Sequence, residues 1–129
     1  MIIDYYKWIG LPHKFAADPD DGEGADCLIV AHKVLLANNF PCPPISSKWI
    51  ELAASQRWGE LEKEWHKYMV RVDTPQGCDL SMTRNEVTGF AIGVVVDNGL
   101  LFVHHRKGVA WVPLSLVKTD FWRIRSAAF

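Results

Sequence analysis

The sequence predicts an α+β fold in which a helical N-terminal half packs on a small antiparallel β-sheet. In the first half of the chain, apolar residues recur every three or four positions, which is the period of a helix with one buried face. In the second half, β-branched residues lead into the tripeptide Asp97-Asn98-Gly99. This tripeptide predicts a tight hairpin, because Asn and Gly tolerate the positive φ that type I′ turns require. Helices followed by an antiparallel meander make an α+β layout.

Two helices are expected before residue 40. The first covers residues 2–9 and ends before Gly10-Leu11-Pro12. An acidic, glycine-bearing loop follows at residues 17–25. The second helix runs from 26 to 38 and ends at Asn38-Asn39. One face of it carries these residues at helical spacing: Cys27, Val30, Ala31, Val34 and Leu35.

A third helical segment and three strands complete the expected elements. Ser46 or Ser47 can cap the helix, and Gly59 weakens it locally and can split it in two. Its apolar positions recur every three or four residues: Ile50, Ala54, Trp58, Leu61 and Trp65. The strands of the meander are expected at residues 88–96, 100–105 and 109–112.

Composition and length exclude several classes of protein. A chain of 129 residues with 49% hydrophobic and 22% charged residues predicts one domain, residues 1–129, with one core. The formal net charge of -1 leaves no basic field for a nucleic-acid partner. No stretch approaches the roughly 20 apolar residues that span a bilayer, so we expect no membrane insertion. The N-terminus lacks the pattern of a signal peptide, so we expect synthesis in the cytoplasm without a signal peptide.

The sequence predicts no metal and no cofactor. The odd number of cysteines, with no C-x-x-C pair, argues against a disulfide framework and a cysteine zinc site; they are Cys27, Cys42 and Cys78. The acidic loop alternates Asp18, Asp20 and Gly22, but the glycine falls where a calcium loop needs its third ligand. Ile29 occupies the twelfth position, where a bidentate glutamate is required. A solvated loop is the expected structure.

Cys27 is the main candidate for a reactive group. It opens the second helix directly after the glycine-bearing loop, in the positive end of the helix dipole. That position favours the thiolate over the thiol. The alternative is a small apolar side chain on the buried face of the helix, because free cysteine is among the most buried residue types.

A nucleophilic thiol needs a base, normally a histidine within hydrogen-bond reach. His32 lies on the Cys27 helix and points elsewhere, and His66 falls on the charged part of the third helix. His104 and His105 are neighbours on an expected strand, so we expect their side chains on opposite faces. His13 and one of the two strand histidines therefore remain as candidates.

Several segments stand in a recognisable order along nearly the whole chain. They are Gly10-Leu11-Pro12-His13-Lys14-Phe15, the acidic loop, Asp26-Cys27 opening a helix, Thr74-Pro75-Gln76-Gly77-Cys78-Asp79-Leu80, the run 91–99, Leu101-Phe102-Val103-His104, and Phe121-Trp122-Arg123-Ile124-Arg125. Together they resemble the NlpC-type cell-wall peptidases, and the C-terminal part is similar to members of that family encoded in bacteriophage tail regions.

This resemblance implies a papain-like fold and a role for each matched residue. Cys27 would be the nucleophile that attacks a peptide or amide carbonyl in peptidoglycan, and His104 would be the orienting residue. The general base should stand at position 91, where this chain has Ala91. His13 takes the place of the family's tyrosine near the nucleophile. Loss of the base costs several orders of magnitude in rate, because the catalytic groups act as a unit.

The expected function is therefore that of a bacteriophage tail or baseplate component whose catalysis is lost or weak. The resemblance implies a location in the virion, with other phage tail proteins and possibly peptidoglycan as partners. One alternative is an active cysteine endopeptidase or amidase that opens the cell wall during infection, with His13 or His104 as the base. Another is a cytoplasmic thiol hydrolase or acyltransferase on the same fold.

Overall fold

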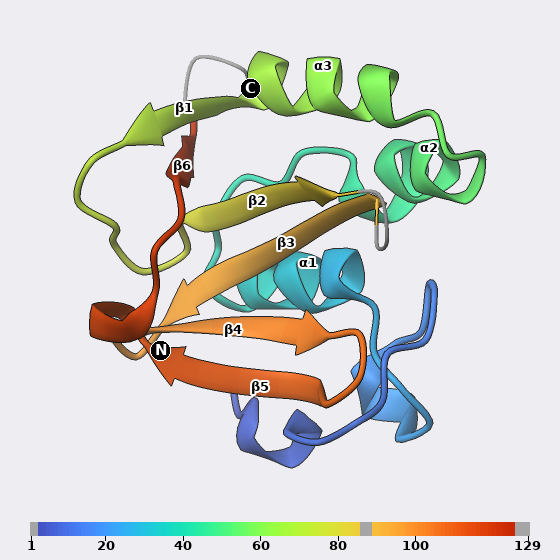
Figure 1. Ribbon diagram of the computed structural model, residues 1–129, viewed down its shortest axis with the longest axis vertical. Coiled ribbons are helices and arrows are strands. Elements are labelled where there is room, and N and C mark those ends of the chain that lie inside the picture. Colours follow the sequence, from blue (N-terminus) through green and yellow to red (C-terminus); the bar gives the residue numbers. More distant parts are fainter. Residues whose placement is uncertain (1–2, 86–88, 126–129) are drawn as a thin grey trace.

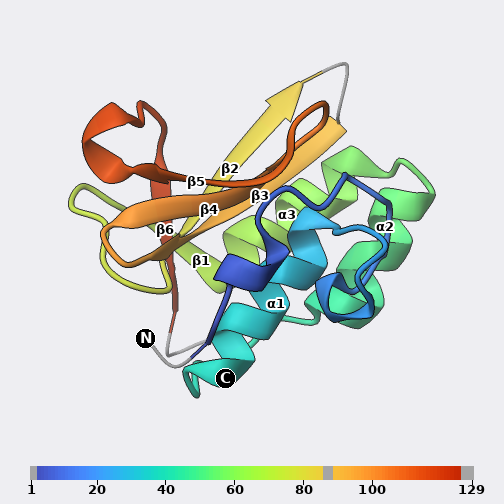
Figure 2. The same ribbon diagram turned by 90° about the horizontal axis from the view of Figure 1, so that it is seen from below.

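The protein is an α+β structure of two layers, with the helices on one face of an antiparallel sheet. The computed structural model describes residues 3–85 and 89–125. Over these residues the sheet has six strands in the order β1-β6-β2-β3-β4-β5, and all neighbours run antiparallel. Figure 1 views the sheet with α1 behind it, and Figure 2 shows the helices gathered on one side of the strands.

The elements have the following bounds. The helices are α1 (Cys27–Ala37), α2 (Ile50–Ala54) and α3 (Trp58–Tyr68). Single turns are η1 (Tyr6–Trp8), η2 (Pro19–Asp21), η3 (Ile45–Trp49, a π-type turn) and η4 (Leu114–Leu116). The strands are β1 (Met69–Val72), β2 (Leu80–Asn85), β3 (Gly89–Val96), β4 (Gly99–His104), β5 (Gly108–Pro113) and β6 (Phe121–Ile124).

Helix α1 confirms the helix expected at residues 26–38. The side chain of Asp26 accepts a hydrogen bond from the backbone N–H of Leu28 at 2.8 Å and so caps the first turn. The buried face of the helix packs against β3 and β4, and it comprises Leu28, Val30, Ala31, Val34 and Leu35. This packing places the first residue of α1, Cys27, next to the centre of the sheet.

The other two expected helices differ from the prediction. Among the described residues of 2–9, only the short turn η1 forms; seven or eight residues are marginal for a helix without tertiary support. The third segment is split as expected, but the break lies at residues 55–57, where Gln56 has a φ of 56°, and Gly59 lies inside α3. Neither Ser46 nor Ser47 caps it, because both lie within η3.

The hairpin expected at Asp97-Asn98-Gly99 joins β3 to β4. Asp97 and Asn98 both have positive φ, 49° and 59°, which is the pair of conformations that a type I′ turn needs. The turn thus lies one residue earlier than the expected Asn98-Gly99 pair, and Gly99 is the first residue of β4. The three expected strands are present as β3, β4 and β5, with Thr88 outside the described residues. Strands β1, β2 and β6 add the half of the sheet that the residue pattern did not predict.

Each face of the sheet has its own apolar cluster. Ile92, Val94 and Val96 belong to the main core, which also contains α1; we call this side the helix face. Val95 belongs to a second cluster with Leu100 and Phe121, covered by residues of η4; we call this side the outer face. Figure 2 shows η4, the red-orange turn, on the side of the strands away from the helices.

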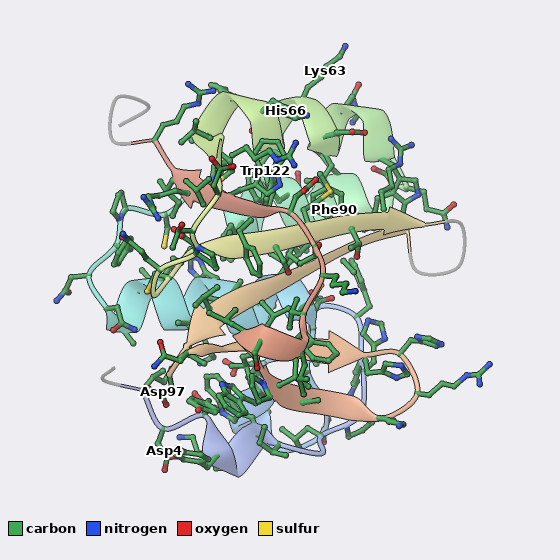
Figure 3. The ribbon with its side chains drawn as sticks, turned by 60° about the vertical axis from the view of Figure 1, so that its left-hand side comes forward. Asp4, Lys63, His66, Phe90, Asp97 and Trp122 are labelled. Atoms are coloured by element: carbon green, nitrogen blue, oxygen red, sulfur yellow. The ribbon has the colours of Figure 1, made fainter. Side chains whose placement is uncertain are left out.

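An aromatic cluster fills the space between α3 and the sheet. Trp65 of α3 is fully buried, and its ring lies 5.8 Å from that of Phe90 and 6.0 Å from that of Trp122, both edge to face. His66 packs on Trp122 at 5.3 Å (Figure 3). Edge-to-face pairs of this kind stabilise a core beyond the area that they bury. His66 is therefore a packing residue.

Candidate functional site

Cys27 lies where the sequence predicted it, at the N-terminus of α1, but its surroundings oppose ionisation. The residue keeps part of its surface exposed. Burial of the thiol, followed by the negative charge of Asp26, raises its pKa to about 12. The backbone N–H of Ile92 faces the sulfur, and it and the N–H groups of Cys27 and Leu28 act in the opposite direction with smaller effect. The thiol therefore stays protonated at neutral pH, although the helix dipole alone favours the thiolate.

Position 91 faces away from Cys27. Along β3, Ile92 lies on the helix face, so strand alternation puts Ala91 on the outer face, where it pairs with Thr83 of β2. There it lines a pocket of about 300 Å³ together with Ser81, Thr83, Gly93, Phe102 and Val117. None of the residues that line this pocket titrates. The position expected for the base thus has an alanine, and the direction of its side chain is away from the thiol.

His104 is the last residue of β4 and is bonded into the following turn. Its Nδ1 accepts hydrogen bonds from the backbone N–H groups of Arg106 and Lys107, both at 3.1 Å. In the neutral ring the proton then resides on Nε2, so neither nitrogen has a free lone pair for a proton. Its pKa is lowered by partial burial and by the neighbouring His105, Lys107 and Arg106.

The expectation that His104 and His105 point to opposite faces is wrong. Their rings stack at 4.6 Å with an angle of 20° between the planes. Strand β4 ends at His104, so His105 belongs to the turn and the alternation of a strand does not continue through it. The pair forms one exposed end of the β4–β5 hairpin.

His13 lies beside the segment that leads into Cys27. It forms an isolated parallel bridge with Ala25, supported by hydrogen bonds from Lys14 N–H to the Ala25 carbonyl at 3.0 Å and from Ala25 N–H to the Pro12 carbonyl at 2.9 Å. The side chain of His13 is exposed. Over residues 3–85 and 89–125, no histidine forms a hydrogen bond with the Cys27 thiol.

The acidic loop is neutralised by basic side chains of the same chain. Lys33 of α1 lies 3.1 Å from an oxygen of Asp18 and 2.8 Å from one of Asp20, and Asp20 also accepts a hydrogen bond from the indole of Trp8 at 2.8 Å. In the described part of the chain, no three His, Cys, Asp or Glu side chains are grouped as metal ligands. The loop therefore fastens the N-terminal segment to α1.

A second concave site, which the sequence did not predict, lies at the β5 edge of the sheet. It brings Tyr5 and Tyr6 against Asp97 and Trp111, residues up to about a hundred positions apart. No local motif signals such a site, because its residues meet only when the N-terminal segment lies along β5. Backbone hydrogen bonds between Gly10 and Leu11 on one side and Val109 on the other hold it there.

No model of a protein family, no curated protein and no solved structure matches the chain. The helices over the described ranges are all too short or too polar to cross a membrane. The fold and site define an α+β domain with a protonated thiol at the start of its central helix.

Proposed function

We propose that this chain is a papain-like domain of the NlpC type, without catalytic activity, that serves as a structural component of a bacteriophage tail. The observation that supports the loss of catalysis best is the relation of Cys27 to β3. The backbone N–H of Ile92 faces the thiol, and at position 91, where the resemblance implies a base, the chain has an alanine whose side chain lies on the outer face. A thiol without a base within reach is a poor nucleophile.

The assignment to the tail rests on the resemblance of the C-terminal segment, which contains β6, to family members encoded in bacteriophage tail regions. The assignment to the family rests on the order of segments along the chain. The thiol-bearing helix precedes an antiparallel sheet, the β3–β4 hairpin follows it, and His104 ends the next strand. In the resembling family this order accompanies binding to peptidoglycan. Without the base, the domain would cap or scaffold the tail tip and could contact the cell wall without cleaving it.

Two measurements test the two parts of this proposal separately. Purified protein is incubated with peptidoglycan, and turbidity and released peptides are followed for the wild type, Cys27→Ser and the control Cys42→Ser. We expect no hydrolysis by any of the three. Hydrolysis that is lost only in Cys27→Ser would overturn the loss of catalysis and establish the cysteine peptidase or amidase instead.

The second measurement concerns location. Mass spectrometry of purified particles of the phage that encodes this chain should detect it in a fixed ratio to other tail proteins. Its absence from the particles, with the protein present in infected or host cells, would refute the structural role whatever the outcome of the hydrolysis assay.

A further inference from the structure

The N-terminal segment and the β3–β4 turn enclose an aromatic pocket with an acidic wall. The pocket has a volume of about 400 Å³ and is lined by Tyr5, Tyr6, Ile9, Asp97 and Trp111. This volume lies in the range of small-molecule sites. Figure 3 shows Asp97 and Asp4 at the same end of the molecule. The pocket lies at the β5 edge of the sheet and shares no lining residue with the surroundings of Cys27.

Two of the three rings, those of Tyr6 and Trp111, keep exposed surface for a ligand, whereas the ring of Tyr5 is almost fully buried. The rings of Tyr5 and Tyr6 lie 4.6 Å apart at 30°, and Tyr6 is 71% exposed. The indole of Trp111 donates to the carbonyl of Val96 at 2.9 Å and lies so close over Gly99 that any side chain there would collide with it. The Trp111 wall of the pocket is therefore in place before a ligand arrives.

The carboxylate of Asp97 is held in place through one of its own two oxygens. Tyr5, which is almost fully buried, donates its hydroxyl to Oδ2 of Asp97 at 2.8 Å. Burial and this hydrogen bond raise the pKa of Tyr5, so the phenol remains a donor toward Asp97. Over the described residues, no basic side chain forms an ion pair with Asp97.

The nearest basic residue along this segment is already engaged elsewhere. Lys7 of η1 lies 3.3 Å from Asp20, in the acidic loop. The pocket itself is lined by aromatic and aliphatic side chains and a single carboxylate, with no cation. Aromatic faces beside a negative charge attract an organic cation, because the ring quadrupole and the carboxylate both favour positive charge.

We propose that this pocket binds an alkylammonium group. The rings of Tyr6 and Trp111 contact the alkyl groups next to the charged nitrogen, Tyr5 positions the carboxylate of Asp97, and Asp97 balances the charge. The group can belong to a small quaternary ammonium compound or to the side chain of a lysine in a partner protein. This inference does not depend on the function proposed for the domain.

Titration followed by nuclear magnetic resonance tests the site directly. The indole N–H of Trp111 gives its own signal, and the indoles of Trp49 and Trp65, buried in the main core, serve as internal controls. Choline is compared at constant ionic strength with 3,3-dimethylbutan-1-ol, which has the same shape without the charge. We expect choline to shift the Trp111 signal with a Kd of about 1 mM, and the neutral compound to bind at least about tenfold more weakly.

Two variants separate the charge from the rings. Asp97→Asn keeps an oxygen for the Tyr5 hydroxyl and tolerates the positive φ at this position, so it should fold and bind choline about tenfold more weakly. Tyr6→Ala should also weaken binding, and Tyr6→Phe should not, because Tyr6 contributes its ring face. Asp120→Asn, at an exposed carboxylate paired with Arg71, is the matched control for net charge and should bind like the wild type.

A second ligand distinguishes a lysine side chain from a quaternary ammonium compound as the source of the ammonium group. Nα-acetyl-lysine methylamide that binds more tightly than choline would identify a lysine side chain, and the reverse order would identify a quaternary ammonium compound. Equal binding of choline and its neutral analogue would show an apolar pocket and overturn the proposal. Absence of any shift at Trp111 up to about 50 mM ligand, or unchanged binding in Asp97→Asn, would overturn it as well.

Discussion

The backbone N–H of Ile92 faces the sulfur of Cys27, and this relation joins the N-terminus of α1 to the middle strands of the sheet. It shows that the helix places its first side chain against β3. It also means that the nearest polar partner from the sheet is a backbone group, which can donate a hydrogen bond but cannot accept the thiol proton.

The first prediction concerns the reactivity of Cys27. With a pKa of about 12, raised mainly by burial, only about one thiol in 10⁵ is ionised at pH 7. Its alkylation by iodoacetamide, measured residue by residue with mass spectrometry, should rise about tenfold per pH unit up to pH 10 or so. Cys42, on the loop after α1, provides the comparison within the same sample. A rate that levels off below about pH 8 would show an activated thiolate and contradict the structure.

The second prediction concerns position 91. Ala91→His supplies an imidazole, but the side chain enters the pocket on the outer face beside Thr83 and Gly93. The pH dependence of Cys27 alkylation should therefore match that of the wild type, and hydrolysis of peptidoglycan should not appear. Ala91→Leu controls for the added volume. If Ala91→His alone shifted the alkylation profile toward neutral pH, the histidine would have reached the thiol and the assignment of strand faces would fail.

The third prediction concerns the ion pair that ties β6 to the start of β2. Asp79 is buried, and Arg123 donates to its Oδ1 from Nε at 2.9 Å and to its Oδ2 at 2.8 Å, while the N–H of Gln76 donates to Oδ2 at 2.7 Å. Asp79→Ala leaves these donors without their acceptor. We expect it to lower the free energy of unfolding in urea by about 3 kcal/mol, near the lower end for a buried pair because Arg123 is partly exposed.

The control for Asp79 is an ion pair of similar length on the surface. Arg71 and Asp120 also lie 2.8 Å apart, but both side chains are more than half exposed. Asp120→Ala should change the free energy of unfolding by less than about 1 kcal/mol. Equal effects of the two substitutions would mean that the Asp79 pair adds nothing beyond a surface contact.

The fourth prediction concerns acid stability. The hydrogen bonds of Asp20 to Lys33 and Trp8 are the main causes that lower its pKa from 3.8 to about 2. Because the folded-state pKa lies below the unfolded-state value, this carboxylate stabilises the fold fully above about pH 5, and the stabilisation is lost as pH falls toward 2. Asp20→Asn keeps an acceptor for the Trp8 indole but removes the charge. The difference in urea midpoint between wild type and Asp20→Asn should shrink from pH 6 to pH 2.5, and a constant difference would contradict this account.

Elements governed by neighbouring residues were predictable from the sequence. Helix α1 begins after Asp26 because that side chain caps its own helix, and the β3–β4 turn forms because Asp97 and Asn98 accept positive φ. Strands β1 and β6 were missed for the opposite reason. Each has four residues, and they pair with each other, Met69 with Ile124, across more than fifty positions. Nothing within either segment indicates that pairing.

The candidate site likewise has features that the sequence predicted and features that it could not predict. The sequence located Cys27 at the helix N-terminus and an alanine at position 91. It could not determine which face of β3 holds Ala91, because that depends on the register of β2 and β3 and on which side α1 packs. It also could not reveal the pairing of Tyr5 with Asp97, which are 92 positions apart.

The sequence by itself therefore determined the α+β class, the helix that carries Cys27 and the hairpin that follows Ala91. The tertiary structure alone decided that the thiol is buried against a backbone N–H, that position 91 and His104 serve other contacts, and that an acidic aromatic pocket forms at the N-terminal edge. The physical reason is the sequence separation over which each kind of interaction acts. Caps and turns act over a few residues, whereas burial, strand face and pocket walls arise from segments that meet only after the whole chain has packed.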